Sequence, residues 1–246
     1  MLYTEENVKA NIRNRDGKRV FYLTKADQLT PGARDWLRRE RIEILPAETA
    51  KPHRYQLLSG GYAEEKPEHM THLNAEVLVS KTHPRIRFRG CMDTLEAELI
   101  LAQLSVPENI AAHLSEILAL ARTLIRCDVL NEPVPDAPLC GLTQEQQRSR
   151  SHRPQDFYGQ PHFMPEAADG LAIARLNRAR CAAREAELHA VNAFTDRDGI
   201  PIRPDILRDL NRMSSMLYIL MIQLKSAGKT RALESDQNQS LGEHYG

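Results

Sequence analysis

The sequence has little excess charge, few aromatic residues and no long hydrophobic segment. Lys plus Arg and Asp plus Glu number 33 each in 246 residues, so no net field favours nucleic acid or an anionic membrane surface. The single tryptophan argues against an aromatic platform for nucleic-acid bases. The longest apolar run, residues 216–224, is interrupted by Gln223 and is too short to span a bilayer. These absences favour a small molecule or a protein as the partner.

Cysteine is scarce and scattered. The chain has four cysteines, at Cys91, Cys127, Cys140 and Cys181. Their wide spacing is unlike a secreted disulfide framework or a zinc motif. We interpret them as buried thiols of a protein in a reducing cytoplasm. The first 19 residues are polar and charged, so we expect neither a signal peptide nor a membrane anchor.

Residues 1–46 predict a small α/β cap. Thr4 followed by two glutamates is typical of a helix start, and a second short helix is expected to begin at Pro31. Residues 19–23 and 41–45 have the composition of strands. About 46 residues bury too little surface to be stable alone, so we expect the cap to dock on the rest of the chain or on a partner.

Residues 47–82 are expected to form a linker followed by a nucleotide-binding loop. The segment up to residue 70 has no sustained periodicity, contains Ser59-Gly60-Gly61 and is rich in charge. A loop of that length is usually either disordered or functional. Metal binding by the histidines in or near it would need closely spaced thiolates or carboxylates, and no cysteine precedes Cys91, so we favour no metal site there. These histidines are His53, His69, His72 and His83.

Residues 83–228 predict an up-and-down bundle of five helices, which makes the fold class mainly α. Apolar residues recur at intervals of three and four over about residues 85–104, and a second helix is expected from Pro107 to about residue 130. A shorter polar helix should begin after Thr143, the central helix should span about residues 166–194, and the last should begin at Pro204. We expect fraying from residue 226 and a flexible tail over 229–246.

The central helix carries a polar stripe opposite a face that is nearly all alanine. Arg180, Arg184 and Glu187 lie at i, i+4 and i+7, so their side chains share one face. Two guanidinium groups followed by a carboxylate could bind a polyphosphate and its metal ion, since arginine matches phosphate oxygens with a rigid fork of donors. A solvated face with ordinary ion pairs is the alternative.

The first bundle helix begins in a basic run. This run could bind an anion together with the backbone N–H groups of the helix terminus, or it could be a solvated collar. Asp93, two turns further on, either faces solvent or meets an arginine of another helix or subunit. The run consists of Lys81, Arg85, Arg87 and Arg89.

Two further polar features stand out near the end of the bundle. Asn211 opens a polar stripe in the middle of the otherwise apolar last helix, so capping does not explain it and a partner is required, either another helix or a ligand. His162 and Phe163 lie in a loop before the central helix, where an aromatic side chain either serves a site or covers the core.

Taken in order, several of these segments resemble one enzyme family. Residues 74–97 resemble the segment of PduO-type ATP:corrinoid adenosyltransferases in which a phosphate-binding loop leads into the first bundle helix. Residues 180–187 are similar to that family's R-x-x-x-R-x-x-E motif, and residues 210–214 to its L-N-R-L-S. Residues 29–33, 70–73 and 164–170 resemble the ethanolamine-utilisation (EutT) branch. The similarity covers nearly the whole chain, from about Thr4 to Ala227.

The resemblance implies a five-helix bundle, usually a trimer with active sites between subunits. It implies that Thr71, His72 and Lys81 contact the nucleotide, with Lys81 on phosphate. Arg184 and Glu187 would position the ATP triphosphate and its Mg²⁺, and Asn211 would contact the nucleotide. Asp93 and Arg180 match a pair that forms a salt bridge across the subunit interface. The loop at His162 and Phe163 matches a loop whose aromatic side chain displaces the lower axial ligand of cobalamin, and either residue could do this.

The implied reaction transfers the 5′-deoxyadenosyl group of ATP to the cobalt of cob(I)alamin, and tripolyphosphate leaves. Arg184, Asp93, Arg180 and Phe163 would be the catalytic residues. The product would serve ethanolamine ammonia-lyase. The other partners suggested by the resemblance are a cobalamin reductant and a microcompartment shell. The protein would act in the cytoplasm or inside a microcompartment. The rival class is a non-catalytic helical protein that binds nucleotide or cobalamin or docks on such a shell.

One feature of the ethanolamine branch is missing from this sequence. Some members carry a histidine and a Cys-Cys-x-x-Cys cluster that binds a metal before their T-H-L motif. Here the corresponding residues 57–62 read Leu-Leu-Ser-Gly-Gly-Tyr. We therefore expect no cysteine-ligated transition metal.

Overall fold

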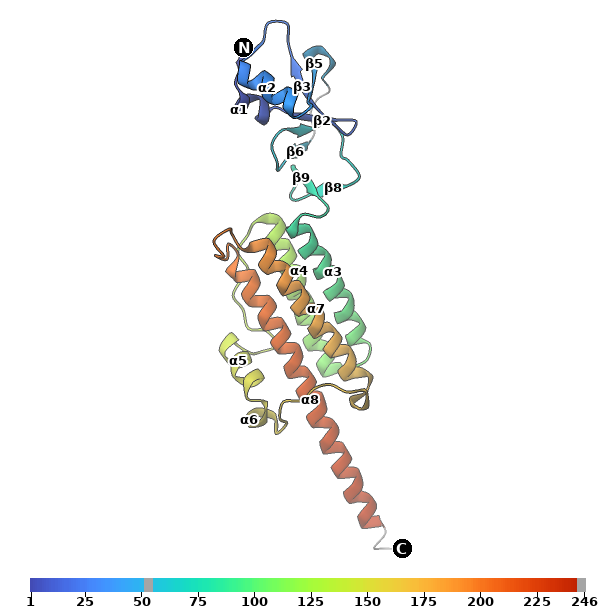
Figure 1. Cartoon of the computed structure of the whole chain (residues 1–246). Coiled ribbons are helices and arrows are strands. Elements are labelled where there is room, and N and C mark those ends of the chain that lie inside the picture. The colour runs from blue at the N-terminus through green and yellow to red at the C-terminus, as the bar shows by residue number, and fades with distance from the viewer. Residues whose placement is uncertain (51–54, 243–246) are drawn as a thin grey trace. The chain divides into compact units, whose positions relative to one another are not determined.

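The chain folds into two units, Met1–Ile86 and Arg87–Gly246 (Figure 1). The structure is a computed structural model that describes residues 1–50 and 55–242, with side chains described as far as residue 228. His53 and the last four residues of the expected tail lie outside the described residues.

The N-terminal unit combines two short helices with a seven-stranded sheet in the order β5-β3-β2-β7-β6-β9-β8. Helix α1 (Glu5–Ala10) begins with a capping box between Thr4 and Asn7, and Thr30 caps α2 (Pro31–Arg39). A separate parallel pair joins β1 to β4. The strands are β1 (Leu2–Tyr3), β2 (Arg13–Arg15), β3 (Lys18–Leu23), β4 (Gln28–Leu29), β5 (Glu43–Pro46), β6 (Tyr55–Leu57), β7 (Tyr62–Ala63), β8 (Met70–His72) and β9 (Val77–Ser80).

The expected α/β elements of residues 1–46 are present. Strand β3 pairs with β2 in antiparallel and with β5 in parallel fashion, and α2 forms the crossover between β3 and β5. Both helices bury their apolar faces in one small core. That core consists of Val8, Ile12, Phe21, Ala33, Leu37 and Ile42.

The segment expected to be a linker instead extends the sheet. Strands β6, β7 and β8 have only two or three residues each, too few to show an alternating pattern in the sequence. They are held by backbone pairing, for example Gln56 with Val77 and Thr71 with Val79. Gly61 makes the approach of β7 to β2 possible, because its φ is +82° and an added Cβ would lie 1.9 Å from the carbonyl oxygen of Ile12.

The C-terminal unit is helical, which confirms the mainly α class. Helices α3 (Pro84–Gln103), α4 (Glu108–Leu130), α7 (Gly170–Phe194) and α8 (Pro204–Gly242) are the long ones, and their buried faces share one core. The shorter α5 (Gln144–His152) packs against α8 (Figure 1). None of the described helices is long and apolar enough to cross a membrane.

Most expected helix boundaries agree with the structure to within a few residues. Pro107 caps α4, Thr143 caps α5 with a capping box, and α8 begins at Pro204. Helix α6 (Pro154–Tyr158) was not predicted and begins at a proline, which suits the first turn of a helix. The backbone of α8 is helical through Gly242, although fraying was expected from residue 226. Residues 229–234 contain good helix formers, which accounts for the difference.

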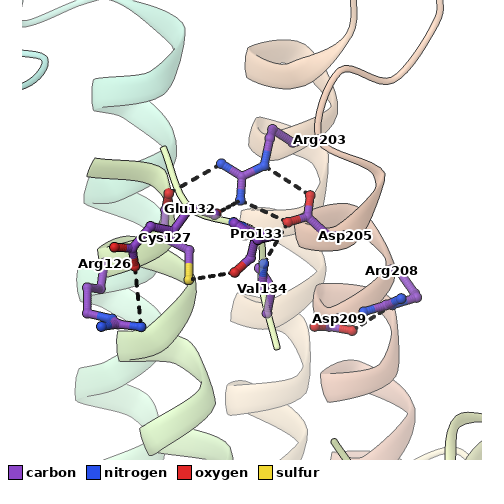
Figure 2. A network of polar contacts seen from close by, with 9 residues as sticks. All are labelled: Arg126, Cys127, Glu132, Pro133, Val134, Arg203, Asp205, Arg208 and Asp209. Carbon is purple, nitrogen blue, oxygen red and sulfur yellow. Dashed lines mark hydrogen bonds and ion pairs between the residues drawn. The ribbon is translucent and has the colours of Figure 1, made fainter. Parts of the chain in front are cut away.

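A partly buried polar network fixes the start of α8 to the end of α4 (Figure 2). Arg203 binds both carboxylate oxygens of Asp205, at 3.0 and 2.9 Å, and also donates to the carbonyl oxygens of Cys127 and Glu132. Asp205 accepts the backbone N–H of Val134 at 2.9 Å. The network sets the position of α8, and so of the polar residues further along it.

Candidate functional site

Helices α7 and α8 pack side by side (Figure 1). They carry Arg180, Arg184, Glu187 and Asn211 among the candidate residues. The alanine face of α7 is buried, which allows close packing against neighbouring helices. The buried alanines are Ala179, Ala182, Ala183, Ala186 and Ala190.

Asn211 joins the two helices through Glu187. Its Nδ2 donates to Oε1 of Glu187 at 3.1 Å, and its Oδ1 accepts from Arg212 at 2.7 Å. Arg212 also donates to the carbonyl oxygen of Gln144 on the neighbouring segment, at 3.4 Å. Burial lowers the pKa of Arg212, and the positive charge of Arg148 lowers it further. The partner required by the polar interruption in α8 is thus an acid on another helix.

Arg184 lies one turn from Glu187 on the same face of α7. Its side chain is exposed and makes no hydrogen bond or ion pair with the part of the chain that the structure describes. Glu187 uses only one carboxylate oxygen, toward Asn211. A cation and a carboxylate oxygen are therefore available to an anionic ligand and its metal ion.

Arg180, the first arginine of the stripe, is held in place within its own chain. Its Nε and one terminal nitrogen donate to Oδ1 of Asn177, both at 3.1 Å, and its guanidinium lies 5.9 Å from the ring centre of Tyr218. Asp93 is exposed on α3, and the bonds found for Arg180 do not include it. The expected pair between subunits stays a prediction.

Tyr218 of α8 organises the loop that contains His162 and Phe163. Its hydroxyl lies 3.1 Å from Nδ1 of His162 and accepts the backbone N–H of Phe163 at 3.2 Å. Nε2 of His162 lies 3.1 Å from the carbonyl oxygen of His152, which can only accept, so Nε2 carries a proton. The Tyr218 hydroxyl can donate to the carbonyl oxygen of Phe163 at 3.4 Å. The rings of His162 and Tyr218 are stacked at 5.7 Å.

A cavity of about 380 Å³ opens beside this loop. Lys225 lies 4.2 Å from the ring centre of Phe163 and pairs with Asp169 at 2.6 Å, a bond that lowers the pKa of Asp169. The lining of the cavity is mainly aromatic and apolar, with the guanidinium of Arg180 as its cation, which suits a ligand with an apolar body and polar groups. Its lining consists of His162, Phe163, Met164, Pro165, Arg180 and Tyr218.

The polar cluster of Arg184, Glu187 and Asn211 lies on the same pair of helices as the cavity. Arg180 and Glu187 are seven residues apart on α7, as are Asn211 and Tyr218 on α8. Seven residues correspond to about 10 Å along a helix. Two ligands, one at each place, would therefore come within the length of a nucleotide of each other.

Three expected residues lie in the N-terminal unit. Thr71 and His72 belong to β8, where the His72 ring meets Tyr55 edge-on at 5.6 Å. Lys81 follows β9, is exposed, and lies 3.5 Å from Glu68. Their contact with a nucleotide stays a prediction.

Arg89, the last residue of the basic run, has a partner inside the bundle. Arg89 pairs with the fully buried Asp128 at 2.7 Å, so this arginine is engaged within the bundle. Such a pair is costly to break, because the remaining carboxylate would be buried without a partner.

Sequence reasoning missed Tyr218 and Lys225. Tyr218 lies within the apolar run 216–224 and is its single aromatic residue with a polar tip, which was the available signal. Lys225 follows that run, where nothing in the sequence indicates contact with a loop more than fifty residues earlier.

Comparison with known proteins gives a consistent result. The family model for cobalamin adenosyltransferase matches residues 61–224. The corrinoid adenosyltransferases EutT of Salmonella typhimurium and of Escherichia coli K12 are each 30% identical over 263 aligned positions, covering 98% of this chain and 97% of the relative.

Solved structures similar to this chain include two variants of the PduO-type ATP:corrinoid adenosyltransferase from Lactobacillus reuteri. One, complexed with cobalamin and ATP, has a TM-score of 0.49 and 18% identity, covering 66% of this chain and 89% of that one. The other, complexed with ATP, has a TM-score of 0.46 and 19% identity, covering 63% and 87%.

Proposed function

The chain belongs to the cobalamin adenosyltransferase family, a family of transferases, and we propose that it transfers the 5′-deoxyadenosyl group of ATP to the cobalt of reduced cobalamin. The family resemblance inferred from the motifs is confirmed by these matches. The observation that carries the proposal is the stripe on α7. In this stripe, Arg184 and the Glu187 carboxylate, of which one oxygen is bonded to Asn211, lie within about two turns of the aromatic cavity.

The reaction needs no nucleophile from the protein. The electron pair on cob(I)alamin cobalt attacks the 5′ carbon, a cobalt–carbon bond forms, and the carbon–oxygen bond to the triphosphate breaks. The bonding pair leaves with tripolyphosphate, so negative charge grows on the phosphates. The protein's tasks are to hold the two reactants in line and to neutralise that charge.

On the ATP side, we assign phosphate binding to Arg184 and nucleotide contact to Asn211. The free carboxylate oxygen of Glu187 fits Mg²⁺, which is commonly bound by one or two carboxylates together with substrate phosphates. The ion would neutralise phosphate charge, and the bond from Asn211 restrains the Glu187 carboxylate. Lys81, Thr71 and His72 are proposed as further nucleotide contacts.

On the corrinoid side, we assign the cavity beside Tyr218. Phe163 is the better candidate to displace the lower axial ligand, because both ring nitrogens of His162 are engaged within the chain. An aromatic face there excludes water from the cobalt, which favours its reduced state. Arg180 at the cavity edge would pair with Asp93 of another subunit in a trimer.

We further propose the physiological setting implied by the EutT relatives. A cytoplasmic reductant would supply cob(I)alamin, and the adenosylcobalamin would pass to ethanolamine ammonia-lyase, in the cytoplasm or inside a microcompartment.

The direct test mixes the purified protein with ATP, Mg²⁺ and chemically reduced cobalamin and follows the visible spectrum. We expect conversion to adenosylcobalamin with release of one tripolyphosphate per turnover. Intact ATP binding without conversion would instead establish the non-catalytic alternative.

A residue-level test replaces Arg184 with alanine. Turnover should fall by about a hundredfold or more, since a cation facing developing phosphate charge is lost, while the circular dichroism spectrum stays unchanged. Arg197→Ala is the matched control, because Arg197 is an exposed arginine in the loop after α7. Equal turnover in the two variants would show that the triphosphate binds elsewhere.

A further inference from the structure

Three side chains that belong neither to the proposed ATP site nor to the cavity beside Tyr218 converge between α3 and α7. They are Cys91 on α3 and Glu185 and His189, one turn apart on α7. One ligand atom from each lies within 4.8 Å of the other two. We propose that these three residues bind a divalent transition-metal ion, with Zn²⁺, Co²⁺ or Fe²⁺ as the chemical class.

The scaffold beneath them is rigid. Cys91 precedes the fully buried Met92, and the ring of Phe88 one turn earlier meets Phe194 of α7 edge-on at 5.3 Å. Glu185 and His189 alternate with the buried alanines of α7. In a tetrahedral site with bonds of about 2.0–2.3 Å, ligand atoms are roughly 3.3–3.8 Å apart, so small side-chain rotations suffice to close the site.

The three donors have no other polar partner. In the described part of the chain, the side chains of Cys91, Glu185 and His189 make no hydrogen bond or ion pair. A second trio with similar spacing differs, because its polar atoms form hydrogen bonds with one another and with the backbone. There Glu116 pairs with His113 through one oxygen and accepts the backbone N–H of Cys140 through the other, and the Cys140 thiol donates to a carbonyl.

The donor set selects the kind of ion. One thiolate, one imidazole and one carboxylate suit borderline metals, whereas Mg²⁺ prefers oxygen ligands alone. A thiolate and a carboxylate balance the 2+ charge, and three protein ligands leave a fourth position for water. The Cys91 thiol must lose its proton to act as a ligand, so metal binding releases a proton and affinity should increase with pH.

The site is distinct from the proposed ATP site. Glu185 and Glu187 differ by two residues, about 200° around the helix, so Glu185 faces α3 whereas Glu187 faces α8. The site would tie α3 to α7. It would replace the expectation of no cysteine-ligated metal, which rested on residues 57–62 and on the wide spacing of the four cysteines.

The test titrates chelator-stripped full-length protein with Co²⁺ and records its absorption. We expect one equivalent to bind, with visible ligand-field bands and a near-ultraviolet thiolate-to-cobalt band. Cys91→Ser should abolish the thiolate band and weaken binding by about a hundredfold or more, and His189→Ala should weaken it comparably. Cys181→Ser is the control and should retain both, since Cys181 lies one turn before Glu185 and is exposed, in contrast to the buried thiol expected from the sequence.

A stability readout covers variants that fold poorly. Zn²⁺ should raise the melting temperature of the wild type and of Cys181→Ser but not that of Cys91→Ser. Two results would overturn the proposal. One is a wild type with no saturable thiolate band at one equivalent, and the other is a band that persists in Cys91→Ser.

Discussion

The bond between Arg203 and Asp205 should make the stability of the bundle depend on pH. Burial alone would raise the pKa of Asp205, but hydrogen bonds from Arg203 and from the backbone N–H groups of Val134 and Ile206 outweigh it and lower the pKa to about 2. A carboxyl whose pKa is lower in the folded protein stabilises it above the ordinary pKa of 3.8, and this contribution is lost as the pH falls toward 2.

The size of the effect follows from the two pKa values. A decrease from 3.8 to about 2 corresponds to about 2 kcal/mol at pH 7, because one pH unit is worth about 1.4 kcal/mol. The Asp205 side chain is 21% exposed, so solvent screens the pair only in part. At pH 3 about half of the contribution should remain. Asp205→Asn should therefore lower the free energy of unfolding by about 2 kcal/mol at pH 7 and about 1 kcal/mol at pH 3.

Urea unfolding followed by circular dichroism at both pH values measures this difference. Asp198→Asn is the control, because Asp198 is an exposed aspartate in the preceding loop, and its replacement should change stability by less than about 0.5 kcal/mol. The reasoning is refuted if Asp205→Asn costs the same at pH 3 as at pH 7, since the loss would then owe nothing to ionisation.

Two further predictions concern the loop and the sheet. Tyr218→Phe keeps the stacked ring but removes the hydroxyl bonds to His162 and Phe163, so cobalamin turnover should fall about tenfold while the helix content stays unchanged. Wild-type kinetics in this variant would show that the loop does not need the hydroxyl as an anchor. Gly61→Ala should destabilise the N-terminal unit by more than about 2 kcal/mol, because its Cβ would meet a backbone oxygen. Gly17→Ala, which is also at positive φ but has open space around it, should cost about 1 kcal/mol. Equal losses of stability for the two variants in denaturant unfolding would contradict this account.

The position of Asn211 links the stability of the bundle to the proposed function. Its bond to Glu187 fixes the register of α8 against α7, and the Arg203 network fixes where α8 begins. Together these contacts hold the polar cluster and the Tyr218 cavity at a set separation. Transfer between two bound reactants requires such a separation, because a misplacement of about 1 Å can cost a hundredfold in rate.

Local sequence signals were sufficient to locate the helices of the bundle and the stripe on α7. Apolar residues at three- and four-residue spacing, with caps at Thr143 and Pro107, located the helices because these signals act within one or two turns. The same local periodicity put Arg180, Arg184 and Glu187 on one face. The ordered motifs were enough to indicate the family.

Contacts between residues far apart in the sequence depend instead on the packing of the whole fold. Strands of two or three residues at 55–63 carry no periodic signal and exist because neighbouring backbone pairs with them. The partner of Asn211, the anchoring role of Tyr218 and the convergence of Cys91 with His189 depend on how helices pack. Periodicity records which face of an element is buried, whereas the neighbour of that face is set by packing across the whole fold.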